Sequence, residues 1–396
     1  MSLTENGLAE AEAEEVKRYL SFEDMDINMS LLRGIYTLGF EKPSMIQQKG
    51  IVPALKGKDV ILHSQSGTGK TATFSIAVLN GINFDKSDPH TVQALVLSPT
   101  RDLAQQTHKV INNLGSYMNI NCHCCIGGKS TRDDFDALRN SPHIVAGTPG
   151  RIIANMKNKS LLTRKIKVVV IDECDVMLTE GFKEDMYFIF TMLPKNAQVI
   201  IVSATFPVQV LEISKKFMNN PTKILIPQEE ITLEGIKQFY IPCSNDFIKE
   251  DVLKDLFEML TLAQTVIFTN SKIRAIGLCE AMNKDDHSAT CIHSDMPQKE
   301  REEILRGFVK GESRVLIATD IIARGIDVQQ ISLVVNYDLP GSKENYIHRI
   351  GRGGRFGRKS VAINLVSDRD MYKLQELEQF YSTAIEPMPQ DIANYF

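Results

Sequence analysis

Short apolar runs alternate with longer amphipathic stretches along most of the chain. In the first half the runs are DVIL, QALVLS, HIVAG, KVVVID and QVIIVSA, and enough residues for a helix lie between one run and the next. Apolar runs of this length, rich in β-branched residues, predict strands that are buried on both faces. Their alternation with helical stretches predicts βαβ units and a parallel sheet.

The same pattern returns after Phe239 with the runs QTVIFT, SATCIH, SRVLIAT, SLVVNYD and VAINLV. We therefore predict an α/β protein with two domains in tandem, each a parallel sheet flanked by helices, at residues 21–226 and 238–396. The polar segment 227–237 contains Pro and Gly and is the predicted linker between them. Residues 1–20 lack apolar periodicity and are predicted to be a flexible acidic tail.

Composition places the chain among ordinary globular proteins. Hydrophobic residues make up 43% and charged residues 24% of the 396 residues, and no apolar run approaches 18 residues. A membrane span is therefore not expected. The first residues lack the basic and apolar regions of a signal peptide, so we expect the protein in the cytosol.

The net charge of the chain is small. It is −4, and residues 1 to 16 hold five Glu and no Lys or Arg, so the rest of the chain is nearly neutral. Strong nonspecific attraction to nucleic acid requires an excess of cations. Any binding of nucleic acid must therefore be built locally.

The seven cysteines indicate reduced, structural thiols. Their number is odd, and the segment CHCC holds a single C-x2-C pair, Cys122 and Cys125, without the second pair of ligands that a tetrahedral zinc site usually shows. A zinc site in this segment is the alternative that we weigh against structural thiols.

The run SQSGTGKT directly follows the strand-like run DVIL and leads into the helical stretch TATFSIAVL. It matches a P-loop except at its first position, where Ser64 replaces Gly. Gly67 and Gly69 let backbone N–H groups approach phosphates, and the helix N-terminus adds the positive end of its dipole. Lys70 is predicted to reach the β and γ phosphates of a nucleotide, and the Thr71 hydroxyl to bind Mg²⁺. The alternative, a glycine-rich turn that closes a βα unit, gives no reason for the GKT ending.

The strand-like run KVVVI delivers the acidic segment DECD to the same edge of the predicted sheet. Asp172 is predicted to hold Mg²⁺ through its water shell, and Glu173 to orient and deprotonate the attacking water. Cys174 is expected to point into the core. A reactive thiol is the alternative, but the neighbouring carboxylates should raise the pKa of Cys174.

A basic stretch, YIHRIGRGGRFGRK, lies in the second predicted domain. Its cations are Arg349, Arg352, Arg355, Arg358 and Lys359. The arginines recur every third residue among glycines, so several can converge on one point. We predict arginine fingers that reach a γ-phosphate, with ATP drawing the two domains together. A solvated basic face or a nuclear-import patch is the alternative.

Taken in this order, the three motifs resemble those of the DEAD-box RNA helicases. GFEKPSMIQQ is similar to the adenine-reading segment of that family, with Phe22 upstream as its aromatic residue. PTRDLA, the pair Gly127 and Gly128, TPGR, SAT and ATDIIARGID follow in the order that the family shows. The series runs from Phe22 to about Arg358 and covers most of the chain. Within the family, DMPQKERE and NYDLP resemble segments of the translation initiation helicases and their exon-junction paralogue.

This resemblance implies two RecA-like domains that use ATP and Mg²⁺, bind single-stranded RNA and melt short duplexes locally. It also implies a monomer that acts in translation initiation in the cytoplasm, with a HEAT-repeat scaffold or another initiation factor as its partner. An ATP-gated RNA clamp that serves as a scaffold on mRNA shares every motif, and would allow a nuclear protein. A DNA-directed helicase is a further alternative.

The resemblance also assigns the nucleotide contacts and the catalytic residues. Phe40 would stack on adenine, and Gln47 would hydrogen-bond its edge. Arg352 and Arg355 would be the arginine fingers that act with Lys70, Asp172 and Glu173. The remaining nucleotide-binding set is Gly67, Thr68, Gly69, Thr71, Gly325 and Asp327.

Two further sets are implied in the same way. The residues that would meet RNA phosphates and 2′-hydroxyls are Thr100, Arg101, Gly128, Thr148, Arg151, Arg301, Thr319 and Arg324. The residues that would couple the two domains are Asp175, Ser203, Thr205 and His348. Contacts centred on phosphates carry no base information, so binding without sequence preference is expected.

The chain departs from the family pattern at three positions. Cys174 replaces the usual Ala, Asp102 replaces the usual Glu, and Ser360 stands where close relatives often have Gly. Taken singly, some of the matching residues also have plainer explanations: Phe22 and Phe40 are common as core aromatics, and the glycine pair 127–128 as an ordinary turn.

Overall fold

A computed structural model describes most of the chain. The described residues are 16–64, 68–83, 92–179, 182–204, 208–226, 236–260, 264–320, 331–351, 360–381 and 383–395. The chain divides into two compact units, with the division near Pro227. Each unit contains one parallel sheet of seven strands, so the predicted pair of α/β domains is confirmed.

The sheet of unit 1 has the strand order β3-β4-β2-β5-β6-β1-β7, and neighbouring strands are parallel throughout. Its strands are β1 (Val60–His63), β2 (Ala94–Leu97), β3 (Cys122–Cys125), β4 (Ile144–Gly147), β5 (Val168–Ile171), β6 (Gln198–Ser203) and β7 (Thr222–Leu225). The carboxyl ends of all seven therefore lie along one edge. The order separates this edge into a β3-β4-β2 half and a β5-β6-β1 half.

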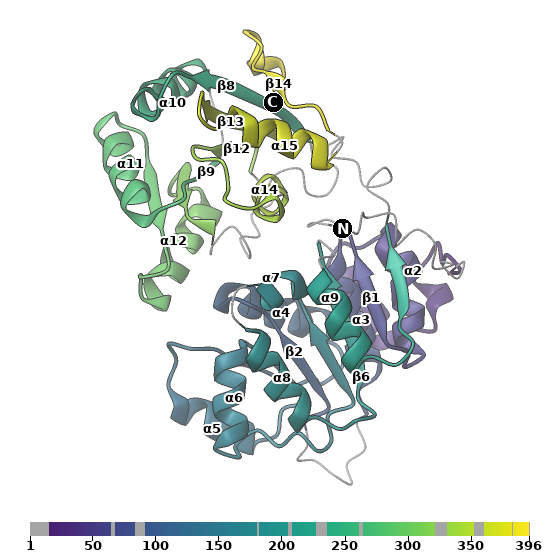
Figure 1. Ribbon diagram of the computed structural model, residues 1–396. Coiled ribbons are helices and arrows are strands. Elements are labelled where there is room, and N and C mark those ends of the chain that lie inside the picture. Colours follow the sequence, from purple (N-terminus) through teal and green to yellow (C-terminus); the bar gives the residue numbers. More distant parts are fainter. Residues whose placement is uncertain are drawn as a thin grey trace. The chain divides into compact units, whose positions relative to one another are not determined.

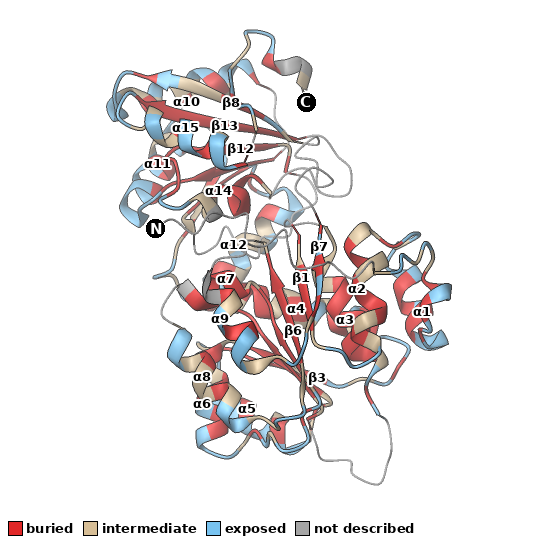
Figure 2. Cartoon of the chain, turned by 45° about the vertical axis from the view of Figure 1, so that its right-hand side comes forward, coloured by how far each residue is buried: buried red, intermediate tan, exposed pale blue. Residues whose placement is uncertain are grey.

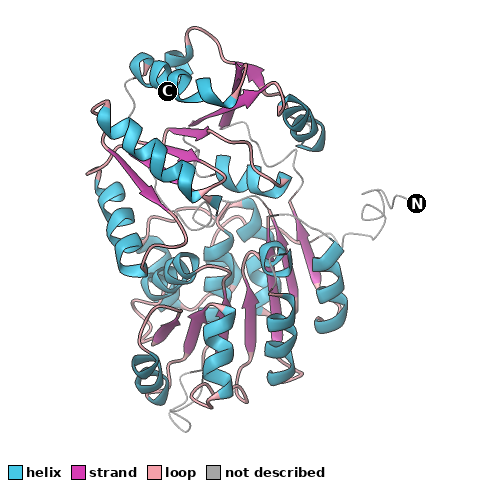
Figure 3. Cartoon of the chain, turned by 60° about the vertical axis from the view of Figure 1, so that its left-hand side comes forward, coloured by secondary structure: helices cyan, strands magenta, loops and turns pink. Residues whose placement is uncertain are grey.

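Helices flank the strands of unit 1, as Figures 1 and 3 show. They are α1 (Met29–Thr37), α2 (Met45–Leu55), α3 (Lys70–Asn80), α4 (Arg101–Leu114), α5 (Thr131–Arg139), α6 (Pro149–Lys157), α7 (Cys174–Thr179), α8 (Lys183–Met192) and α9 (Val208–Phe217). A short 3-10 helix at Glu23–Met25 precedes them. Because a parallel connection needs a crossover, each helix that follows a strand returns the chain to the start of the next.

The sheet of unit 2 has the order β10-β11-β9-β12-β13-β8-β14 and is again parallel. Its strands are β8 (Ile236–Cys243), β9 (Thr265–Phe268), β10 (Ala289–Ile292), β11 (Val315–Ala318), β12 (Leu333–Asn336), β13 (Ser360–Ser367) and β14 (Glu386–Pro387). The helices are α10 (Lys249–Met259), α11 (Lys272–Lys284), α12 (Gln298–Lys310), α14 (Lys343–Ile350) and α15 (Met371–Tyr381), with 3-10 turns at Asp246–Ile248 and Ile392–Tyr395. Numbered from its own first strand, each sheet has the same order.

The cores lie between the sheets and their helices, where the central strands of both sheets, such as β2, β4, β9 and β12, are fully buried (Figure 2). Phe22 is fully buried and packs edge-to-face with the Tyr36 ring. It is therefore a core aromatic, which was the alternative to a role in adenine recognition. Within the described residues, no helix combines the length and apolarity that a membrane crossing requires.

The structure adds strands that the apolar pattern does not predict. β3 has the sequence CHCC, β7 alternates buried and exposed residues, and β14 is only two residues long. β8 begins at Ile236 and so takes in the last two residues of the segment predicted as linker. Residues 227–235 of that segment, and residues 1–15 of the predicted tail, lie outside the described residues.

Candidate functional site

The P-loop segment connects β1 to α3, as the sequence predicts. Gly69 precedes the first residue of α3 with a φ of +95°, a backbone conformation that favours glycine. A Cβ on Gly69 would also lie only 2.7 Å from the Gln47 side-chain nitrogen. Both backbone and space therefore require glycine here. Residues 65–67, among them Gly67, lie outside the described residues.

Lys70 and Thr71 form the first turn of α3, and both are half-buried. The Lys70 ammonium donates a hydrogen bond to the Ser64 carbonyl oxygen, and the Ser64 and Thr68 hydroxyl oxygens are 2.7 Å apart. Ser64, which replaces the first P-loop glycine, is thus hydrogen-bonded to Thr68 and Lys70 at the other end of the loop. The Lys70 side chain is held at the mouth of the loop, where a nucleotide phosphate would lie.

Gln47 lies against the P-loop although 22 residues separate it from Gly69. It is the third residue of α2, and its side-chain oxygen accepts a hydrogen bond from the Ser44 N–H at 2.8 Å, which caps that helix. Its side-chain nitrogen is 3.5 Å from the Gly69 carbonyl oxygen, and the Ser44 hydroxyl donates to the Thr68 carbonyl oxygen at 2.7 Å. The predicted adenine-reading segment and the P-loop are therefore one connected structure.

Phe40 lies in the turn between α1 and α2. Its side chain is half-buried, and its N–H donates to the Ile35 carbonyl oxygen at 3.3 Å. Stacking of Phe40 on adenine stays a prediction.

Asp172 follows β5 directly, and its N–H continues the sheet by donating to the Leu97 carbonyl oxygen at 2.9 Å. The carboxyl group is almost fully buried and accepts a hydrogen bond from the Glu173 N–H at 3.0 Å. Burial, and then the negative charge of Glu173, raise the pKa of Asp172 to about 7, while Lys70 acts in the opposite direction. The electrostatic effect of Lys70 indicates that P-loop and acidic segment lie close together.

Glu173 adopts a left-handed backbone conformation with a φ of +47°. Such a conformation is costly for a residue with a side chain and is found mainly at functional sites. Among the described residues, one carboxylate oxygen of Glu173 is buried without a hydrogen-bond partner. A buried acceptor in this position suits a water molecule that must be oriented and deprotonated.

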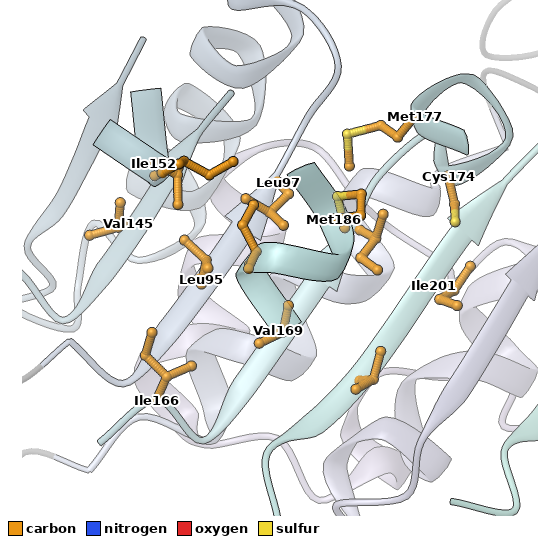
Figure 4. Packing of buried hydrophobic residues seen from close by; sticks show 14 of the residues in the cluster. Leu95, Leu97, Val145, Ile152, Ile166, Val169, Cys174, Met177, Met186 and Ile201 are labelled. Atoms are coloured by element: carbon orange, nitrogen blue, oxygen red, sulfur yellow. The ribbon is translucent and has the colours of Figure 1, made fainter. Parts of the chain in front are cut away.

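Cys174 points into the core of unit 1, as the sequence predicts. It is fully buried in a cluster with Met177, Met186 and Ile201, and Figure 4 shows its side chain among these residues. Burial, with a smaller effect of Asp175, raises the pKa of Cys174 well above its ordinary value. The thiol is therefore neutral, and a reactive cysteine at this position is excluded.

His63, which sequence reasoning did not single out, lies beside the site at the end of β1. It pairs with Ser203 across the two parallel strands. Burial and the Lys70 charge lower the pKa of His63 to about 4, against the opposite effect of Asp175, so the imidazole is neutral. Its only signal in the sequence is its place directly before the P-loop. Asp175 and Ser203, both predicted coupling residues, are buried and lie near His63.

The other half of the same edge gathers the predicted RNA contacts of unit 1. Thr100 follows β2 and begins α4, where its hydroxyl accepts a hydrogen bond from the Leu103 N–H. Thr148 follows β4 and begins α6. Two helix N-termini thereby lie on adjacent strands, and each offers backbone N–H groups to an anion.

The glycine pair after β3 completes this group. Gly128 has a φ of +84°, and the Arg101 guanidinium lies 3.0 Å from where a Cβ on Gly127 would be. The structure therefore brings the arginine after β2 onto the glycine turn after β3. The turn has a specific role here, because any larger residue at position 127 would displace Arg101.

Arg151, in the first turn of α6, is held by contacts of its guanidinium group with two other residues. Its guanidinium donates to the Lys129 carbonyl oxygen, and its Nε lies 3.6 Å from the carboxylate of the buried residue Asp134. One terminal nitrogen of Arg151 is buried without a hydrogen-bond partner among the described residues. An arginine with a spare donor at this edge is suited to a phosphate. Asp134 was not predicted from the sequence.

In unit 2 the predicted residues are partly described. Arg301 is buried in the first turn of α12, Thr319 follows β11 and is half-buried, and His348 is buried in α14. The remaining predictions in this unit, Arg324, Gly325, Asp327, Arg352 and Arg355, lie outside the described residues. So do Arg358 and Lys359 of the basic stretch, and Thr205 of unit 1.

Arg349 differs from what the spacing of the basic stretch suggests. Its side chain is fully buried, and it donates hydrogen bonds to the Asp320 carboxylate at 2.5 Å, the Asp338 carbonyl oxygen at 2.6 Å and the Asn270 side chain at 2.8 Å. This arginine therefore fixes α14 to the ends of three strands and cannot converge with its neighbours on a phosphate. The regular spacing of the arginines among glycines does not reveal which of them is buried in the core.

Two departures from the family pattern are now placed. Asp102 is buried in the first turn of α4, where a carboxylate stabilises the helix N-terminus. Ser360 is buried at the start of β13 and nothing in the structure explains the change.

Comparison with known families agrees with this geometry. Residues 44–213 match the DEAD/DEAH box helicase family and residues 248–357 match the helicase conserved C-terminal domain. The chain is 53% identical over 376 residues to a Chaetomium globosum protein named ATP-dependent RNA helicase eIF4A, and the match covers 94% of each chain. It is 52% identical over 389 residues to eukaryotic initiation factor 4A of Caenorhabditis elegans, a match that covers 98% of this chain and 96% of that protein.

Solved structures agree in fold. S. cerevisiae Dbp5 bound to RNA and ADP BeF3 superposes with a TM-score of 0.86 at 34% identity, over 93% of this chain and 95% of that chain. Mss116p bound to single-stranded RNA and AMP-PNP superposes with a TM-score of 0.84 at 25% identity, over 95% of this chain and 81% of that chain.

Proposed function

The chain belongs to the DEAD-box helicase family, and on that premise we propose that its two units form an RNA-stimulated ATPase that unwinds RNA locally during translation initiation. The family membership makes it an ATP-dependent RNA helicase. The observation that carries the proposed site is the connected set of Gln47, Gly69, Lys70 and Asp172, because no packing requirement of the sheet explains why these four groups meet.

Adenine recognition is assigned to Gln47, with Phe40 stacking on the ring. The capping box of α2 fixes the Gln47 side chain, so it is presented to the base without loss of rotamer freedom. Thr68, Gly69 and Lys70 surround the phosphates through backbone N–H groups and the ammonium, and Gly67 is assigned the same role. Gly325 and Asp327 of unit 2 are proposed to contact ribose and phosphate.

Hydrolysis is assigned to the edge formed by β1, β6 and β5. The Asp172 carboxylate and the Thr71 hydroxyl are oxygen donors, which is the donor type that Mg²⁺ prefers, and we assign them to the ion, largely through water. When bound, Mg²⁺ supplies charge neutralisation at the phosphates. Glu173 accepts a proton from the attacking water as the oxygen–phosphorus bond forms and ADP leaves. Arg352 and Arg355 are proposed as the arginine fingers that stabilise the charge of the transferred phosphoryl group.

RNA binding is assigned to the β3-β4-β2 half of the same edge in unit 1. Thr100, Arg101, Gly128, Thr148 and Arg151 meet there, which supports contacts to successive phosphates. In unit 2 the proposed contacts are Arg301, Thr319 and Arg324. Because nucleotide and RNA sites share one sheet edge in unit 1, binding at either site can shift the strand ends that support the other.

Coupling between nucleotide and RNA is assigned to a third set of residues. Ser203 pairs with His63, whose pKa is affected by the charges of Asp175 and Lys70, which supports the assignment of Asp175 and Ser203. Thr205 and His348 are proposed to complete the set. We propose a cytoplasmic monomer with a HEAT-repeat scaffold or another initiation factor as its partner, as the resemblance of the motifs implies.

The test is steady-state ATP hydrolysis by the full chain with and without single-stranded RNA, with single-stranded DNA as the control and Lys70→Ala as the blank. Selective stimulation by RNA that the mutant lacks is the expected result. Equal stimulation by DNA would contradict the assignment to RNA. Strand displacement of a short RNA duplex then separates a helicase from an ATP-gated clamp, because a clamp binds RNA but displaces no strand.

A further inference from the structure

Three metal-binding side chains meet beneath the proposed RNA-binding edge, at a place that the mechanism does not use. His123 and Cys125 point to the same face of β3, because side chains alternate along a strand, and Asp134 comes from α5. One nitrogen, one sulfur and one oxygen of these residues lie within 4.8 Å of one another. We propose that His123, Cys125 and Asp134 form a site for Zn²⁺ or a similar borderline cation, and that the ion lowers the affinity for RNA.

The donor set fits this class of ion. Imidazole, thiolate and carboxylate are the three ligand types of protein zinc sites, and three protein ligands leave a fourth position for water. At tetrahedral angles such ligand atoms lie about 3.3 to 3.6 Å apart. The His123 nitrogen and the Asp134 oxygen are 2.9 Å apart as a hydrogen-bonded pair and would separate by about 0.4 Å, while the Cys125 sulfur would move by about 1 Å, to reach this geometry.

The site has a path for entry and a buried interior. The His123 side chain is 24% exposed, whereas Asp134 is 2% exposed and Cys125 is fully buried. The C-x2-C pair of the segment CHCC, Cys122 and Cys125, lies on one strand, where residues three apart point to opposite faces and cannot bind one ion. The spacing that matters is i, i+2 on one strand face, with the third ligand from the following helix.

The proposed ion competes with a residue of the RNA edge, and this step rests on the proposed function. The Asp134 carboxylate accepts hydrogen bonds from the His123 ring at 2.9 Å and from the Asn155 amide at 3.4 Å. It also forms an ion pair with the Arg151 Nε at 3.6 Å. A cation at this carboxylate removes the support of Arg151 and places a second positive charge beside its guanidinium. By linkage, RNA held through Arg151 must weaken cation binding to the same degree.

Protons balance in the binding step. Burial, and then the negative charge of Asp134, raise the pKa of the Cys125 thiol far above its ordinary value, so the free site holds a neutral thiol. Formation of the metal–sulfur bond releases this proton to solvent. The His123 Nε2 proton, which is donated to Asp134 in the free site, moves to Nδ1, so that Nε2 of the neutral imidazole can bind the ion.

The first experiment uses Co²⁺ as a spectroscopic stand-in for Zn²⁺ on the full chain, freed of metal and without nucleotide. A thiolate-to-Co²⁺ charge-transfer absorption that Zn²⁺ abolishes is expected. Cys125→Ser and His123→Gln should lose this absorption, and His123→Gln keeps the test valid if the buried Cys125 variant does not fold. Cys124→Ser, on the opposite face of the same strand, should retain it. Absence of the absorption, or equal loss in Cys124→Ser, would overturn the site.

The second experiment measures affinity for labelled single-stranded RNA in the presence of Mg²⁺ and a nonhydrolysable ATP analogue, with buffered Zn²⁺. Zn²⁺ should weaken binding by about fivefold or more in the parent chain and in Cys124→Ser, but not in His123→Gln. Unchanged RNA affinity in a chain that binds Co²⁺ would overturn the competition. Loss of RNA binding in the absence of Zn²⁺ would contradict the proposed function instead, so the two failures are distinguishable.

Discussion

The Gln47 side-chain nitrogen lies 3.5 Å from the Gly69 carbonyl oxygen, and it occupies the space where a Cβ on Gly69 would lie. This contact joins the base-reading segment to the phosphate-binding loop before any nucleotide arrives. It implies that the loop and the glutamine act as one unit.

Substitution of Gly69 by Ala should damage this unit in two ways. The φ of +95° costs about 1 to 3 kcal/mol for a residue with a side chain, and the new methyl group displaces Gln47. We expect a lower free energy of unfolding by denaturant and a large loss of affinity for ATP. Gly81→Ala at the other end of α3 is the matched control, because its φ of −84° is open to any residue and its Cβ would have normal contacts. Equal effects of both changes would contradict the role of Gly69.

Substitution of Glu173 by Gln should separate binding from chemistry. The amide keeps the shape of the side chain but cannot accept the proton of the attacking water, so kcat should fall by about 100-fold or more. Affinity for a nonhydrolysable ATP analogue should stay within about twofold of the parent, because the change removes an interaction that is made only in the transition state. Full turnover by this variant would remove Glu173 from its assigned role. Glu184→Gln in the first turn of α8 is the control.

Affinity for Mg²⁺ in the absence of nucleotide should depend on pH through Asp172. Burial and the charge of Glu173 raise the pKa of Asp172 to about 7, so a proton competes with the ion below this pH. Affinity should fall about tenfold for each pH unit below 7 and reach a plateau above it. Isothermal titration at pH 6, 7 and 8 measures the trend. Asp172→Asn should abolish it, and a pH-independent affinity in the parent chain would contradict the buried carboxylate.

Substitution of Arg349 by Met should destabilise unit 2. The change leaves the Asp320 carboxylate, the Asp338 carbonyl oxygen and the Asn270 side-chain oxygen without the donors of Arg349, and a buried acceptor left without a donor typically costs about 1 to 3 kcal/mol. Arg306→Met, at an exposed position of α12, should change the free energy of unfolding by less than about 0.5 kcal/mol. Denaturant unfolding followed by circular dichroism compares them. Equal stability of the two variants would contradict the structural role of Arg349.

The sequence predicts the elements that carry strong local patterns. The long apolar strands, the P-loop at Lys70 and the acidic segment after β5 all lie where periodicity and motif spacing place them. The inward direction of Cys174 follows from its position at a strand end, and its burial confirms that prediction. Nucleotide chemistry at this edge is therefore readable from sequence.

The rest depends on packing that no local pattern encodes. β3 is built from Cys and His, and β14 is a two-residue strand, so each forms because an existing sheet edge pairs with it. Asp134 has no motif, and it supports Arg151 only because α5 crosses above β3. Arg349 and its neighbours look alike in sequence, and tertiary contacts alone decide which one is buried.

The shared strand order of the two sheets makes β1 and β8 the equivalent first strands of the two units, which bears on where a nucleotide binds. After β1 the chain forms a phosphate cradle. After β8 the equivalent turn is filled by the protein itself: the Asn245 side chain accepts hydrogen bonds from the N–H groups of Phe247 and Ile248, and the buried Lys249 ammonium lies 2.9 Å from the Asp246 carboxylate. The second copy thus carries an internal carboxylate where the first copy receives a phosphate. We therefore expect ATP to bind after β1 in unit 1 and not at the equivalent turn after β8.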